Sequence, residues 1–83
     1  MLGDATTRQI AEMRDLLARG TLHGLPRVTI GDTVTVDADL AVRVVLANLD
    51  RVRQTGGMSP THWRHIEEHI RRTHQAISGA TAR

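Results

Sequence analysis

In the first third of the chain of 83 residues, apolar side chains at helical spacing are followed by an irregular segment. Apolar side chains recur at helical spacing early in the chain: Ile10, Met13, Leu16 and Leu17. Thr6 or Thr7 is suited to cap this helix, and Gly20 after a basic residue is typical of a helix end. Gly24 and Pro26, which follow Gly20, then predict a loop or an irregular edge strand.

Two short β-branched runs follow, with Gly31 and Asp32 between them, and predict a β-hairpin. A two-residue loop would pair Ile30 with Thr33 and mix apolar with polar side chains on one face. A three-residue loop pairs Ile30 with Val34 and keeps one face apolar. Because a slip of one residue inverts every side chain, we expect the three-residue loop.

Residues 37–55 fit two structures. Asp37 is a good helix N-cap and Gly56 a good helix end, which favours one helix between them. The alternative is a strand that continues through residues 38–46, because apolar side chains occupy every second position: Val34, Val36, Ala38, Leu40, Val42, Val44 and Leu46. Both alternatives leave a helix that ends before Gly56.

The last helix is predicted to begin with Ser59 as cap and Pro60 at its first position, or one turn later at Thr61. Its apolar stripe consists of Trp63, Ile66, Ile70 and Ile77. We expect residues 78–83 to form a frayed tail. The fold class is therefore α+β, a helix–β-hairpin–helix–helix domain over residues 1–83 with a core within residues 5–77.

Composition indicates a small core that needs a partner. Hydrophobic residues make up 40% of the chain, but there is one Trp and neither Phe nor Tyr. Chains of this size are marginally stable alone, so we expect self-association or docking onto a larger protein assembly. The absence of cysteine predicts a cytoplasmic protein. No stretch reaches the roughly 18 apolar residues of a membrane span, so we expect no membrane partner.

The candidate chemistry of the chain is sparse. His62, His65 and His69 share one side of the last helix, and residues 65–69 fit an H-x-x-E-H zinc pattern. No third ligand follows at a distance, so we expect no metal and no other cofactor. Neither serine lies in a nucleophile motif and no glycine-rich phosphate loop occurs. We therefore expect no enzyme and no small-molecule substrate.

Several aliphatic blocks support a resemblance to a known family. They are Ile10-Ala11-Glu12-Met13, Leu16-Leu17-Ala18-Arg19-Gly20, Val28-Thr29-Ile30, Asp39-Leu40 and Arg43-Val44-Val45-Leu46-Ala47-Asn48-Leu49-Asp50. With these blocks, residues 9–54 resemble the small shell-forming proteins of gas vesicles. The resemblance implies a non-catalytic structural or assembly subunit that forms a homo-oligomer through its hairpin. Gly24, Pro26 and Arg27 interrupt the segment that matches the family's first strand. The resemblance therefore favours an accessory or nucleating subunit over a protein of the bulk shell.

The alternation of residues 34–46 suits such an assembly, because strands that tile side by side expose one apolar face. The interface residues that we predict on this basis are Val28, Ile30, Val34, Val36, Leu40, Val42 and Val44.

Two further functions fit the sequence. Residues 33–40 resemble the strand and helix start of ribbon–helix–helix repressors, which implies a small dimeric DNA-binding transcriptional regulator of ribbon–helix–helix or antitoxin-like type. Its base-reading candidates are Arg27, Thr33 and Thr35. The other function is that of a docking adaptor, which would bind a larger protein through a partner-helix face made of Trp63, Ile66, Ile70 and Ile77.

Overall fold

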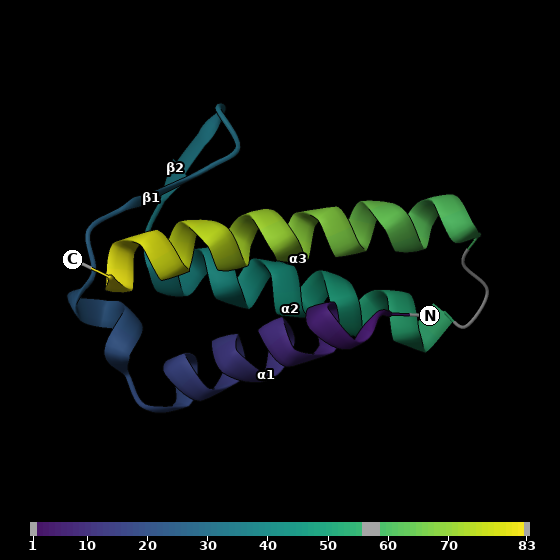
Figure 1. Ribbon diagram of the computed structural model, residues 1–83, viewed down its shortest axis with the longest axis horizontal. Helices are drawn as coiled ribbons and strands as arrows, with labels where there is room; N and C mark the ends of the chain where they lie inside the picture. The colour runs from purple at the N-terminus through teal and green to yellow at the C-terminus, as the bar shows by residue number, and fades with distance from the viewer. Residues whose placement is uncertain (1, 56–58, 83) are drawn as a thin grey trace.

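The computed structural model describes residues 2–55 and 59–82. The elements in chain order are α1 (Asp4–Ala18), a 3-10 helix η1 (Thr21–Gly24), β1 (Val28–Ile30), β2 (Val34–Val36), α2 (Ala38–Thr55) and α3 (Pro60–Thr81). The predicted α+β class and the order helix–hairpin–helix–helix are confirmed. Figure 1 shows the three long helices side by side, with the hairpin projecting near the C-terminal end of α3.

Helix α2 decides between the two structures that residues 37–55 allowed. The carbonyl oxygen of Asp37 accepts a hydrogen bond from the Ala41 N–H at 3.0 Å, so the helix begins directly after Asp37. The strand that was expected as an alternative over residues 38–46 is therefore wrong. Its main-chain amides pair within the helix rather than with a neighbouring chain, because one side of the helix is apolar along its whole length. That buried side consists of Ala38, Ala41, Val42, Val45, Leu46, Leu49 and Val52.

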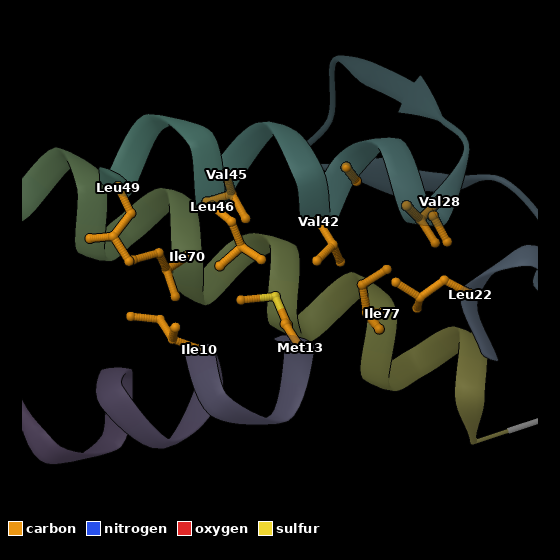
Figure 2. Packing of buried hydrophobic residues seen from close by; sticks show 12 residues of the cluster. Ile10, Met13, Leu22, Val28, Val42, Val45, Leu46, Leu49, Ile70 and Ile77 are labelled. Carbon is orange, nitrogen blue, oxygen red and sulfur yellow. The ribbon is translucent and has the colours of Figure 1, made fainter. Parts of the chain in front are cut away.

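The core lies where α1, α2 and α3 meet (Figure 2). Met13 from α1, Leu49 from α2 and Ile70 from α3 are each fully buried. At the other end of the core, Leu22 from η1 and Ile77 from α3 close the gap between the helices. Burying a side chain of this size stabilises the fold by about 1.5–3 kcal/mol, so these few residues carry most of the stability.

Polar contacts join α1 to α3 at both ends. The Glu67 carboxylate accepts hydrogen bonds from the Gly3 N–H and the Thr6 hydroxyl, each at 3.1 Å. Because the first N–H groups of a helix have no partner within it, this carboxylate stabilises the start of α1. The cap is Gly3, three or four residues before the predicted caps Thr6 and Thr7. Further along, the imidazole of His74 lies 2.5 Å from the carboxylate of Glu12.

The hairpin has the predicted register. Ile30 pairs with Val34 and Val28 with Val36, which leaves a three-residue loop. Gly31 in this loop has a φ of 62°, a conformation that other residues rarely adopt. Val28 is buried, and β1 packs against α3. The outer strand, β2, remains largely exposed.

Helix α3 begins as predicted and ends later. The Ser59 hydroxyl accepts a hydrogen bond from the His62 N–H at 3.4 Å, and Pro60 occupies the first turn. The frayed tail that was expected from residue 78 is wrong, because α3 continues to Thr81 and Ala80 packs against the core. The predicted end of the preceding helix at Gly56 lies outside the described residues. Among the residues that the structure describes, no helix is long and apolar enough to cross a lipid bilayer.

Candidate functional site

An apolar groove runs between the hairpin, α2 and α3. It encloses about 290 Å³ and is lined by Ile30, Val34, Val36, Leu40, Ala41, Val44, His69 and Thr73. Six of these eight side chains are hydrocarbon, so the groove suits an apolar occupant.

Three large hydrophobic side chains on the wall of this groove are exposed to solvent. The exposed fraction is 49% for Val34, 48% for Leu40 and 44% for Val44. A single exposed apolar side chain is ordinary, but these three adjoin one apolar groove and form an exposed apolar patch with it. We call the surface formed by Val34, Leu40 and Val44 the apolar rim.

Helix α2 supplies two members of the apolar rim because it is apolar on two sides. Residues two positions apart on a helix differ by about 200° in direction and so lie on nearly opposite faces. Ala38, Val42 and Leu46 consequently face the core, whereas Leu40 and Val44 face solvent. The alternation that made a strand plausible is therefore the signal of a helix with a second apolar face.

His69 and Thr73, one turn apart on α3, provide the polar groups of the groove. Thr73 is fully buried, and its hydroxyl has no hydrogen-bond partner among the described residues. His69 is half-buried. Burial, together with the positive charge of Arg72, lowers the pKa of His69 from its ordinary value of 6.5. The ring is therefore neutral at pH 7.

Charges of both signs border the groove. The Arg27 guanidinium lies 3.3 Å from the Asp37 carboxylate, directly before α2. The Arg43 guanidinium lies 3.6 Å from the Asp39 carboxylate in the first turns of α2.

The predicted interface residues divide between this groove and the core. Ile30, Val34, Val36, Leu40 and Val44 line the groove. Val28 and Val42 were also expected at the interface, and the structure places both in the core, where they are inaccessible to a second chain. Val42 is buried because the helix turns it away from Leu40 and Val44.

The predicted partner-helix face is occupied within the chain itself. Ile70 and Ile77 are fully buried, and Trp63 and Ile66 pack against the same core. On this face Ile70 and Ile77 are therefore engaged in the core of their own chain, whereas Trp63 and Ile66 remain partly exposed. The expectation that the face docks onto a partner is corrected for Ile70 and Ile77.

The DNA-reading candidates lie together on the hairpin and its flanks, but two of them are engaged. Arg27 pairs with Asp37, and the hydroxyls of Thr29 and Thr35 lie 3.0 Å apart. Thr33 is exposed in the hairpin loop. Asp32 and Asp37 add negative charge to this region, which phosphate groups disfavour.

The histidines do not converge. His62 and His65 are exposed, whereas His69 turns into the groove. Among the described residues no three His, Asp or Glu side chains are close enough to hold a metal ion. A concavity of about 550 Å³ between α1 and α3 contains Glu67 and Glu68. Glu67 binds the start of α1, and Glu68 binds Arg71 and Arg72.

No protein-family model matches the chain, and neither a curated protein nor a solved structure matches it.

Proposed function

We propose that this chain is a non-catalytic association module that forms a homodimer by covering the apolar rim. The observation that carries the proposal is the clustering of Val34, Leu40 and Val44 beside one groove, each more than two-fifths exposed. Water contact with this surface is unfavourable, and an occupant that covers it gains about 25 cal/mol for each Å² of apolar surface buried.

The hairpin supports a second copy as the occupant. Each strand has three residues and, within the described part of the chain, the sheet consists of these two strands alone. An isolated two-stranded sheet is marginally stable, and its outer edge offers unpaired main-chain groups. The antiparallel edge of β2 can pair with the same edge of a copy related by a twofold axis.

The charges around the groove also favour a second copy. Two identical surfaces that meet across a twofold axis repel each other when their charge has one sign. Here Arg27 pairs with Asp37 and Arg43 with Asp39, close in the chain to the groove residues Val36, Leu40 and Val44, so charges of both signs are available to a second copy. A strongly acidic or basic partner would suit a border of one sign instead.

The proposal retains the self-association expected from the sequence but changes its geometry. Polymerisation through an extended strand over residues 34–44 would need main-chain groups that α2 uses internally beyond Val36. The blocks 39–40 and 43–50, on which the gas-vesicle resemblance rests, both lie on α2. The resemblance to that family stays a prediction, and the association that we propose is a closed dimer.

Sedimentation equilibrium of the full chain over a range of concentrations tests this function. We expect the mass of two chains for the wild type and of one chain for Val44→Glu, because the new carboxylate would be buried without a partner. Ala11→Glu is the matched control: it places the same side chain on the exposed side of α1 and should leave the dimer intact. Circular dichroism checks that both variants keep their helices.

Two outcomes of this experiment contradict the proposal. One is a wild type that sediments as a single chain at every concentration, or whose mass grows without limit. The other is a Val44→Glu variant that keeps the mass of two chains.

A further inference from the structure

One titratable side chain lines the surface that a second copy covers. Of the eight residues that form the groove, seven carry no ionisable group, and the eighth is His69. Its surroundings are the aliphatic side chains of the hairpin and α2, together with the buried hydroxyl of Thr73. A charged imidazolium in this position would lose water on dimerisation and find no carboxylate among the groove residues.

The acidic groups on the neighbouring elements are already paired or lie outside the groove. On the hairpin side, Arg27 is paired with Asp37, and Asp32 lies in the exposed loop. On α2, Asp39 lies near Arg43 at 3.6 Å and near His23 at 3.7 Å.

On α3 itself, Glu68 binds Arg71 and Arg72, and His65 lies one turn before His69. Arg72 lowers the pKa of His69 by repulsion, in addition to the effect of burial. Glu68, the acid next in sequence, is therefore committed to two arginines rather than to the imidazole.

We propose that a second copy closes over the groove only when His69 is neutral, so that His69 makes the self-association dependent on pH. This inference rests on the proposed function and names the residue that regulates it. Protonation of the imidazole thus controls dimerisation. A second apolar surface binds in the groove while the ring is neutral, and its binding is unfavourable when the ring is charged.

The direction of the effect follows from the burial of the ring. Burial already lowers the pKa of His69 in the single chain, and covering the groove adds to that burial. The dimer therefore binds fewer protons than two separate chains. The affinity between two chains has its full value at pH values above the pKa of His69 in the single chain. It is lost as the pH falls below that pKa. Because each dimer contains two copies of His69, the dissociation constant should rise by up to about 100-fold for each pH unit below that pKa.

The experiment measures the dissociation constant of the full chain by sedimentation between about pH 8 and about pH 5, the range in which histidine titrates. The variant His69→Gln keeps a neutral polar side chain and should dimerise with little dependence on pH. His65→Gln is the matched control, because His65 lies on the same helix but is exposed and outside the groove. It should keep the pH dependence of the wild type.

A second measurement needs no variant. Titration of the His69 ring by NMR should give a lower pKa in a concentrated, dimeric sample than in a dilute, monomeric one. An equal pKa in the two samples, or an identical pH dependence of wild type and His69→Gln, would overturn the inference while leaving the dimer itself intact. A wild type that never dimerises would instead refute the proposed function and this inference together.

Discussion

Two leucines on α2 allow a direct comparison between the inner and the outer face of one helix. Leu49 is fully buried between α1 and α3, whereas Leu40 is 48% exposed on the apolar rim. Replacing each with alanine removes the same atoms from the same helix, and alanine suits a helix at either position. The two substitutions should nevertheless act on different properties of the protein.

The expected magnitudes differ severalfold. Removal of a fully buried leucine side chain costs about 2–5 kcal/mol, since the transfer free energy is lost and a cavity remains. A chain of this length has a total stability of about 4–12 kcal/mol, so Leu49→Ala removes a large part of it. A leucine that is half exposed contributes at most about half of the 1.5–3 kcal/mol of full burial, so Leu40→Ala should cost about 1 kcal/mol or less.

Urea denaturation followed by circular dichroism measures both free energies of unfolding. At a protein concentration low enough for single chains, Leu49→Ala should lower the midpoint strongly and Leu40→Ala only slightly. At high concentration, the wild type should gain stability from dimerisation and Leu40→Ala should gain less. The reasoning is refuted if the two variants lose equal stability as single chains, because α2 would then not present one face to the core and the other to solvent.

Three further outcomes are expected. Thr73→Val should raise the free energy of unfolding by about 1 kcal/mol in the same urea assay, because the buried Thr73 hydroxyl lacks a partner among the described residues; a loss of stability would show that the hydroxyl is satisfied. Gly20→Ala should cost about 1 kcal/mol in thermal unfolding, because Gly20 has a φ of 73° and no atom within 4 Å of an added Cβ to compensate; an unchanged midpoint would contradict this backbone conformation. The hydrogen bond from Arg71, together with the charges of Arg71 and Arg72 and the hydrogen bond from Arg72, lowers the pKa of Glu68 to about 2. Arg71→Gln should therefore raise that pKa part of the way toward 4.5 in a carboxyl NMR titration. In the wild type the stabilisation is present above pH 4.5 and is lost as the pH falls toward 2, and an unchanged Glu68 pKa in the variant would show that Arg71 is not its cause.

The hairpin was predictable to the residue because its register depends on local rules. With β-branched residues on both sides of Gly31, a single loop length keeps Val28, Ile30, Val34 and Val36 on one face. The cap at Ser59 was one of two starts that the sequence allowed, the other being Thr61, since its hydroxyl and the following proline act within one turn.

The conformation of residues 38–46 was not predictable from local pattern. Apolar side chains at every second position satisfy a strand, and the same side chains satisfy a helix that is apolar on two sides. The choice between strand and helix is decided by the burial of Val45 and Leu49 against α1 and α3. This burial depends on segments far away in the sequence. The start of α1 was missed for a similar reason, because the Glu67 carboxylate that stabilises it lies 64 residues from Gly3.

The candidate site was found only in part for the same reason. Five of the seven predicted interface residues line the groove, since the apolar alternation identifies them in either conformation. Val42 was assigned to the interface because a strand would place it beside Leu40 and Val44, and a helix places it opposite. His69 was considered only as part of a zinc pattern, and its place in the groove depends on the approach of the hairpin to α3.

The central claim is that two copies meet at the apolar rim. An isotope-filtered NOE experiment on a mixture of labelled and unlabelled chains detects contacts between copies and no others. The account predicts such contacts at the methyl groups of Val34, Leu40 and Val44. Contacts between copies that involve other surfaces but not these methyl groups would contradict it, as would their complete absence at concentrations where the wild type should be dimeric.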